Sequence, residues 1–217
     1  MSKTGNGRGP GPGVLIEGDL IGCWLCQRAL SPRALFCHAC GALQPLRALD
    51  PFARLNLERR FDIGQEQLER QYTGLRRTLD PQRFATRVGR ERQHAREHLD
   101  ALTKAYEILK DPVRRARWLL DQEGVGVPTA EEADAADPDM ASEVVRLRHD
   151  LATAEDVNDI DVVAARVTRN IEGCLKRLAV AFRNGDLALA AIVLVRMSSF
   201  EAVAEEARST RSRKTPV

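Results

Sequence analysis

Aromatic side chains and long apolar runs are both scarce in this chain of 217 residues. Phe, Trp and Tyr make up 5% of the sequence, which argues against stacking platforms for single-stranded nucleic acid. The formal net charge is only +2, so the composition gives no general attraction to nucleic acid or to a membrane. No run of about 18 apolar residues is present, and we therefore expect no membrane-spanning segment.

Targeting and catalytic motifs are missing as well. Residues 1–13 are rich in Gly and Pro and have neither the apolar core of a signal peptide nor an Arg/Ser-rich amphipathic helix. The glycines of this stretch do not form a phosphate-binding loop, because no strand precedes them and no helix follows. No Ser/His/Asp arrangement supports nucleophilic catalysis. We expect a cytoplasmic protein with a disordered leader and no enzymatic activity of its own.

Four of the five cysteines form two CxxC pairs, Cys23/Cys26 and Cys37/Cys40, separated by ten residues. Two such pairs can present four thiolates to a tetrahedral zinc ion, and a shell filled by four cysteines is typical of a structural site rather than a catalytic one. A segment this short has almost no core, so the metal would supply most of its folding free energy. A dithiol redox pair, two disulfides or an iron site with the same ligands are the alternatives.

The residues around the cysteines support tight turns. Gln27 and Gly41 follow the two pairs at positions where a turn must close, and Trp24 and Phe36 are expected to pack over the metal. His38 lies between two ligands, but four cysteines already fill the shell, so we expect it at the surface.

The stretch Gln65–Lys110 contains two helix-patterned segments joined by a polar turn. Pro81 breaks the helix between them, because it lacks an amide hydrogen and disfavours helical angles at the residue before it. The two apolar stripes predict an antiparallel helical hairpin with an exposed polar tip. They consist of Leu68, Tyr72, Leu75 and Leu79 in the first segment, and Ala95, Leu99, Leu102, Tyr106 and Leu109 in the second. His94 and His98 share a face of the second helix, which we interpret as solvated.

Helix start and stop signals organise the rest of the chain. Asp50-Pro51 and Asp111-Pro112 each combine an N-cap with a proline in the first turn. Asn184-Gly185-Asp186 indicates a helix end, a left-handed turn and a new N-cap. Cys174 lies on the apolar face of a predicted helix and is interpreted as a buried thiol. The predicted parts are a leader over 1–20, a metal-binding segment over 21–46, a hairpin domain over 50–121, a linker over 122–139, a three-helix bundle over 140–207 and a basic tail over 208–217.

The order of these parts resembles a known family. "AYEILKDPVRRARWLL" at Ala105–Leu120 is similar to the end of a J domain. Together with "DPFARLNL" at Asp50–Leu57, "LRHDL" at Leu147–Leu151 and the cysteines followed by "GALQP" at Gly41–Pro45, it resembles an HscB-type co-chaperone of iron–sulfur cluster assembly. The resemblance implies an all-α fold: a J-domain hairpin and a C-terminal three-helix bundle, preceded by a small zinc-knuckle segment.

The resemblance also implies two protein partners. The J domain would dock on a DnaK-type chaperone and trigger its ATP hydrolysis, and the bundle would deliver an iron–sulfur cluster scaffold protein. The family's chaperone contacts are a basic helix face and a His-Pro-Asp tip. The matching positions here are Arg70, Arg76, Arg77, Asp80, Pro81, Gln82 and Arg83. Only the proline of the tip is kept, so we expect weakened hydrogen bonding to the chaperone there.

The scaffold contacts that the resemblance implies are also altered. The matching positions are Ala141, Ser142, Val145, Arg148 and Phe200. Ala and Ser offer less apolar contact area than the larger side chains usual there. Three interpretations follow: a working co-chaperone with structural zinc, a J-like adaptor that binds a scaffold or other partner without activating the chaperone, and a thiol redox or cluster-carrying protein. The third is the weakest, because no oxidoreductase core or nucleotide-binding motif is present.

Overall fold

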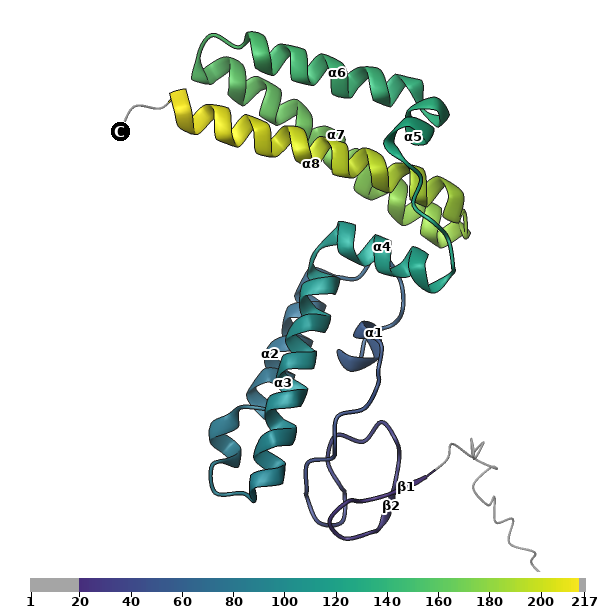
Figure 1. The fold of residues 1–217 in the computed structure, drawn as a ribbon, viewed down its shortest axis with the longest axis vertical. Helices are drawn as coiled ribbons and strands as arrows, with labels where there is room; N and C mark the ends of the chain where they lie inside the picture. Colours follow the sequence, from purple (N-terminus) through teal and green to yellow (C-terminus); the bar gives the residue numbers. More distant parts are fainter. Residues whose placement is uncertain (1–19, 215–217) are drawn as a thin grey trace, which may run out of the picture. The chain divides into compact units, whose positions relative to one another are not determined.

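A computed structural model describes residues 20–214 (Figure 1). The expected leader, except for Leu20, and residues 215–217 of the expected tail lie outside the described part of the chain. The described residues fall into two compact units, one within Met1–Ala48 and Leu79–Leu99, the other within Leu49–Thr78 and Asp100–Val217. The predicted all-α class with a small metal-binding segment is confirmed.

The first unit begins with a two-stranded antiparallel sheet of β1 (Ile21–Gly22) and β2 (Ala29–Leu30), in which Ile21 pairs with Leu30. The hydrophobic cluster beside this sheet is small, with Cys23, Leu30 and Cys37 buried and Ile21 and Ala34 packed against them. An isolated backbone bridge joins Phe36 to Leu43. So little buried apolar surface cannot hold a segment of this length together without help from cross-links or a metal.

The hairpin tip belongs to the same unit. Asp80 caps a short 3-10 helix, η1 (Pro81–Phe84), and its carboxylate accepts a hydrogen bond of 2.9 Å from the Gln82 amide. Helix α3 (Gly89–Lys110) follows, and its residues Gly89–Leu99 complete the unit. The helix break predicted at Pro81 is confirmed.

The second unit contains α1 (Pro51–Arg54), α2 (Gln65–Thr78), the Asp100–Lys110 part of α3, and α4 (Pro112–Gln122). Tyr72 of α2 stacks on Tyr106 of α3 with ring centroids 4.0 Å apart, as the two apolar stripes predicted. The Tyr106 hydroxyl donates a hydrogen bond of 2.5 Å to Glu69. This hydrogen bond and burial raise the pKa of Tyr106 to about 12.

The predicted helix caps are present. The Asp50 carboxylate accepts a hydrogen bond of 2.8 Å from the Ala53 amide at the start of α1. Asp111 accepts hydrogen bonds from the Val113 and Arg114 amides, at 2.8 and 3.1 Å, at the start of α4. Each cap satisfies amides that have no partner within the helix, which fixes where the helix begins.

The C-terminal bundle consists of α6 (Pro138–Thr153), α7 (Val157–Asn184) and α8 (Leu187–Lys214). Gly185 ends α7 in the left-handed conformation, with φ of 72°, and Asp186 accepts a hydrogen bond of 3.0 Å from the Leu189 amide. The turn predicted from Asn184-Gly185-Asp186 is therefore confirmed. Cys174 is buried, as predicted, and burial raises the pKa of its thiol to about 11. The largest side chains in the bundle core are Leu147, Ile160, Leu178, Leu194 and Phe200.

Two segments are more ordered than their composition suggested. Residues 130–136 of the expected linker form helix α5 (Ala130–Ala136), which Thr129 and Glu132 start with a reciprocal capping box and which buries Ala133. The expected basic tail is helical to Lys214, because α8 continues along the bundle and Arg211 pairs with Asp161 at 2.8 Å.

Helix α4 packs against α8, which joins the J-like part of the unit to the bundle. Phe61 stacks on Phe182 of α7 with ring centroids 5.2 Å apart, and the buried Arg115 guanidinium lies 5.0 Å above the Phe61 ring. Asp62 pairs with Arg183 at 3.2 Å beside this stack. The Phe61–Phe182 and Asp62–Arg183 contacts connect residues more than a hundred positions apart, so sequence proximity gives no hint of them.

Helix α8 is long and apolar enough, by length and composition alone, to cross a membrane. Its apolar side chains are those of a core helix, however, because Val193, Leu194, Met197 and Phe200 are each buried within the unit. Burial of this kind accounts for its hydropathy without a lipid environment.

Candidate metal centre and partner-binding residues

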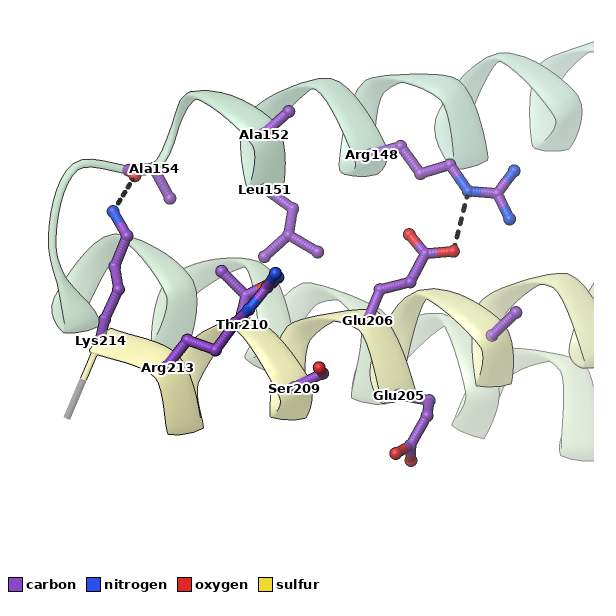
Figure 2. Close-up of a pocket in the computed structure, with 11 residues that line it drawn as sticks. Arg148, Leu151, Ala152, Ala154, Glu205, Glu206, Ser209, Thr210, Arg213 and Lys214 are labelled. Atoms are coloured by element: carbon purple, nitrogen blue, oxygen red, sulfur yellow. Dashed lines mark hydrogen bonds and ion pairs between the residues drawn. The ribbon is translucent and has the colours of Figure 1, made fainter. Parts of the chain in front are cut away.

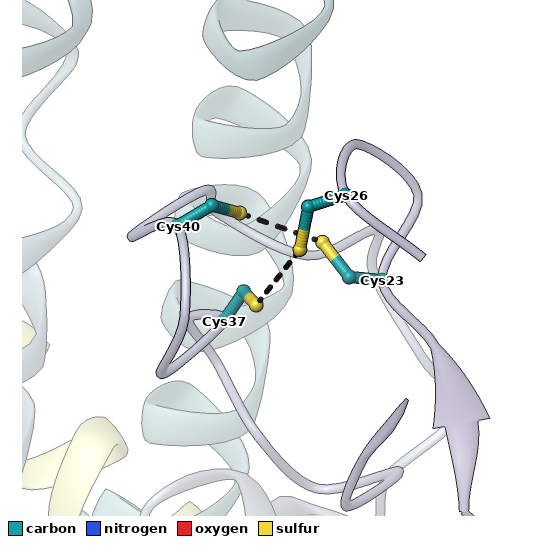
Figure 3. A group of neighbouring side chains, drawn as sticks. All are labelled: Cys23, Cys26, Cys37 and Cys40. Carbon is teal, nitrogen blue, oxygen red and sulfur yellow. Dashed lines mark hydrogen bonds between the residues drawn. The ribbon is translucent and has the colours of Figure 1, made fainter. Parts of the chain in front are cut away.

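The sulfur atoms of Cys23, Cys26, Cys37 and Cys40 all lie within 4.8 Å of one another (Figure 3). The sulfurs of Cys23 and Cys40 are 3.7 Å apart, as are those of Cys26 and Cys37. A zinc–sulfur bond of about 2.3 Å in a tetrahedral site places the ligand sulfurs about 3.8 Å from one another. The four cysteines thus fit a tetrahedral metal ion, and none of the described cysteines forms a disulfide.

Each cysteine pair sits on the same kind of turn. The amide of Gln27 donates to the Cys23 carbonyl at 3.0 Å, and the amide of Gly41 donates to the Cys37 carbonyl at 2.8 Å. Both turn residues have positive φ, 59° at Gln27 and 71° at Gly41. Glycine adopts this conformation without steric strain, whereas the Cβ atom of Gln27 makes the conformation less favourable there. The turns predicted at these two positions are confirmed.

Hydrogen bonds and charge repulsion set the ionisation of the thiols. Burial opposes ionisation of Cys23, but hydrogen bonds from the Cys26 and Leu25 amides and the Gln44 side chain outweigh it and lower its pKa to about 6. The Ala42 amide favours the Cys40 thiolate, but burial and the neighbouring sulfurs raise the pKa of Cys40 to about 12. Four thiolates this close together repel one another, so their full ionisation requires a bound cation.

The two histidines of α3 are not solvated, which corrects the prediction made for them. His94 and His98 are 7% and 9% exposed. The His94 and Trp24 rings pack in a T-shaped arrangement, and His98 Nε2 lies 2.9 Å from the Gln44 carbonyl oxygen. The cysteine segment covers this face of the helix, and no local pattern in α3 indicates such a cover. His38 is exposed, as predicted.

The residues matched to chaperone contacts are mostly at the surface. Arg70, Arg76 and Arg77 are exposed on α2, and Arg70 lies 3.6 Å from Glu66. Pro81, Gln82 and Arg83 are exposed in η1, whereas Asp80 is half-buried and its carboxylate is engaged as the cap of that turn. The Asp80 side chain therefore has a local structural role as the cap of this turn.

The residues matched to scaffold contacts divide into two groups. Val145 is 67% exposed on α6, where Ser142 and Arg148 are also exposed and Ala141 is half-buried. Phe200 is fully buried in the bundle core, so its ring offers no surface to a partner, and its predicted role is wrong. Its place in the apolar stripe of α8 is the physical reason.

Arg148 borders a groove of about 750 Å³ that residues of α6 and α8 line (Figure 2). Its guanidinium lies 3.5 Å from Glu206 of α8, and Leu151 contributes an apolar side chain to the lining. At the far end of the groove, Lys214 donates hydrogen bonds of 2.6 and 2.8 Å to the carbonyl oxygens of Ala154 and Glu155. The groove thus combines an apolar lining with charged side chains.

Sequence reasoning missed two residues beside the metal site. Gln44 donates from its side chain to the Cys23 sulfur at 3.4 Å, and the buried Glu91 accepts a hydrogen bond of 3.1 Å from the Leu43 amide. Gln44 lies within the "GALQP" stretch that carried the family resemblance, which was the one available signal. Nothing in the sequence indicated Glu91.

Comparisons with known proteins agree with this architecture. No protein-family model matches the sequence. The chain is 27% identical over 186 residues to the iron–sulfur cluster co-chaperone protein HscB homolog of Arabidopsis thaliana, a match covering 85% of this chain and 72% of the relative. It is 27% identical over 199 residues to the iron–sulfur cluster co-chaperone protein HscB of Mus musculus, covering 90% of this chain and 83% of the relative.

Solved structures give the same result. The crystal structure of human co-chaperone protein HscB matches with a TM-score of 0.78 and 25% identity, over 90% of this chain and 100% of that chain. Chaperone HscB from Vibrio cholerae matches with a TM-score of 0.65 and 23% identity, over 77% of this chain and 100% of that chain, which supports the fold alone.

The helical hairpin with its fourth helix, the C-terminal three-helix bundle and the tetracysteine segment together resemble the class of J-domain co-chaperones. Within this class, the similarities support an HscB-type co-chaperone of iron–sulfur cluster assembly. The named relatives are co-chaperones.

Proposed function

We propose that this protein presents an iron–sulfur cluster scaffold protein to a DnaK-type chaperone and stimulates ATP hydrolysis by that chaperone. The similarity to HscB co-chaperones along 85–90% of the chain carries this proposal. A J-like hairpin supplies the docking element for the chaperone, and the bundle supplies the surface for the scaffold. The four cysteines would hold structural zinc, and the protein itself would catalyse no reaction.

Electrostatics support the chaperone contact. Arg70, Arg76 and Arg77 give α2 an exposed basic face, and such a face steers encounter with an acidic partner surface. The exposed Arg83 extends the basic character into the turn. The effect should weaken as salt is raised, because exposed charges are screened.

The tip itself favours a second candidate, an adaptor that binds partners without activating the chaperone. Asp80 carries a negative charge where the family has histidine, and Gln82 is neutral where the family has aspartate. Each hydrogen bond lost to a charged partner group is worth about 1.5–3 kcal/mol. Because the Asp80 carboxylate is already occupied by the Gln82 amide, the turn keeps its shape while its contacts change.

Steady-state ATPase measurements on the cognate DnaK-type chaperone separate the two candidates. A working co-chaperone accelerates ATP turnover as wild type, and Asp80→His combined with Gln82→Asp raises the acceleration further. If wild type gives no acceleration and the double substitution creates it, the adaptor is the correct function. If neither protein accelerates turnover, the stimulatory role is wrong.

Binding of the scaffold is tested by pull-down with the purified iron–sulfur scaffold protein. Val145→Arg places a charge in the proposed contact and should weaken binding at least tenfold, because losing a buried valine contact removes about 1.5–3 kcal/mol. Val162→Arg on α7 is the matched control, since Val162 is 62% exposed and Val145 is 67% exposed. Equal binding by the two variants would place the scaffold elsewhere.

A further inference from the structure

The cysteine segment and residues Gly89–Leu99 of α3 share buried polar contacts. The Leu43 amide donates to the Glu91 carboxylate at 3.1 Å, and Glu91 is only 3% exposed. His98, 9% exposed, lies 2.9 Å through its Nε2 from the Gln44 carbonyl oxygen. Leaving buried polar groups of this kind without hydrogen bonds costs free energy. The contacts therefore favour the docked arrangement of the two segments.

An aromatic contact reinforces the same docking. Trp24 donates from its indole nitrogen to the Leu43 carbonyl oxygen at 2.8 Å. The His94 and Trp24 rings pack in a T-shaped arrangement with centroids 5.8 Å apart, and the Arg90 guanidinium lies 5.0 Å above the indole. Trp24 thus contacts α3 from within the first cysteine pair.

Two residues of the docking stretch, Ala42 and Gln44, are hydrogen-bonded to the cysteines. The Gln44 side chain donates to the Cys23 sulfur at 3.4 Å and to the Ala42 carbonyl oxygen at 2.8 Å. The Cys37 amide donates to the same Ala42 carbonyl oxygen at 2.9 Å. The position of residues 42–44 therefore depends on the arrangement of the cysteines.

The face of α3 that the cysteine segment covers is unusually polar for a buried helix face. Its residues are Glu91, His94, Ala95 and His98, all 9% exposed or less. An amphipathic helix normally buries an apolar stripe, which would stay buried against almost any apolar partner. A face built from Glu and His requires specific partners, and the cysteine segment supplies them.

We propose that metal binding by the four cysteines controls the order of Gly89–Leu99, with Glu91 and His98 as the positioning residues that transmit the effect. The metal fixes the cysteines, the cysteines fix residues 42–44, and these residues hold the arm of the hairpin that follows the tip. Loss of the metal releases the contacts that Glu91 and His98 make with Leu43 and Gln44. The co-chaperone hairpin is then complete only in the metal-loaded protein.

Hydrogen–deuterium exchange on the full chain, loaded with zinc alone or stripped with a chelator under reducing conditions, tests the coupling. Peptides from residues 89–99 should exchange at least about tenfold faster after stripping, which corresponds to about 1.4 kcal/mol. Peptides from α7 serve as the internal reference and should not change. This measurement uses the unaltered protein, so it does not depend on a variant folding. Unchanged protection of residues 89–99 would overturn the proposal.

Reciprocity gives a second test. If the metal stabilises the docked arm, the docked arm must stabilise the bound metal by the same factor. Glu91→Ala should therefore weaken zinc retention about tenfold in competition with a colorimetric chelator, and Glu91→Gln, which keeps an acceptor oxygen, should restore most of it. Gln93→Ala, on the exposed side of the same helix, is the matched control. Zinc retention by Glu91→Ala equal to that of the control would overturn the proposed role of Glu91.

Discussion

Replacing Asp134 by alanine should destabilise the second unit by about 2 kcal/mol. Arg196 of α8 is 2% exposed, and its guanidinium reaches the Asp134 carboxylate of α5 and, at 3.3 Å, the Asp137 carbonyl oxygen. Breaking a fully buried ion pair costs about 3–5 kcal/mol, because the remaining charge stays buried without its partner. The Asp134 side chain is 50% exposed, so in the Asp134→Ala variant water can replace part of the hydrogen bonding to the Arg196 guanidinium. The loss of unfolding free energy is therefore smaller than for a fully buried pair.

The matched comparison removes both charges. Asp134→Ala combined with Arg196→Met should recover most of the lost stability, because a methionine fills a similar volume and needs no partner. Urea denaturation followed by far-UV circular dichroism gives the four free energies of a double-mutant cycle. The reasoning is wrong if Asp134→Ala lies within about 0.5 kcal/mol of wild type, or if the double variant is no more stable than the single one.

Two further predictions concern the same unit. Phe200→Ala should lower the free energy of unfolding by about 3–5 kcal/mol in urea denaturation, because it leaves a cavity in the bundle core. Val145→Ala, at the surface, should change this free energy by less than about 0.5 kcal/mol. Equal effects of the two substitutions would place Phe200 outside the core. Burial opposes ionisation of Asp50, but hydrogen bonds from the Ala53 amide and Arg59 outweigh it and lower the pKa of Asp50 below its ordinary 3.8. The stabilisation by ionised Asp50 is therefore present above pH 3.8 and disappears as the pH falls through the lowered pKa. In urea denaturation, wild type should have a larger free energy of unfolding than Asp50→Asn at neutral pH, and the two values should converge in acid. A difference in free energy that persisted unchanged into acid would contradict this prediction.

Features set by a few neighbouring residues could be predicted from the sequence. Asp50, Asp111 and Asp186 cap the helices that follow them, because a cap needs only a side-chain acceptor and the amides two or three positions on. The same holds for the cysteine turns, where Gln27 and Gly41 close each turn. These features depend on local geometry, so local sequence was enough.

Features set by distant packing could not be predicted. His94 and His98 were interpreted as a solvated face because α3 alone gives them no cover. Their cover comes from Trp24 and Gln44, which lie far earlier in the chain. Helix α5 was expected to be a linker because its composition is acidic and rich in alanine, yet burial of Ala133 and the Asp134–Arg196 pair hold it on α8. In both cases the deciding partner is invisible to a local pattern.

The placement of Phe200 failed for a different reason. Phe200 follows the buried Val193 and Met197 at helical spacing on α8, but alignment with a family position suggested a contact surface. A carried-over position identifies a place along a helix, and the burial of the side chain depends on which face it occupies. The geometric pattern was the better guide here.

Helix α8 packs against α4, α5, α6 and α7, so these four helices share one central helix. Without α8, the faces that the stretches 112–136 and 138–184 pack against it would both be exposed to water. Neither stretch can therefore bury its apolar side chains by itself. Such sharing couples their folding, and the second unit should melt in a single cooperative transition rather than domain by domain. A fragment ending before Leu187 would expose the apolar faces of α4 and α7 together and would tend to aggregate.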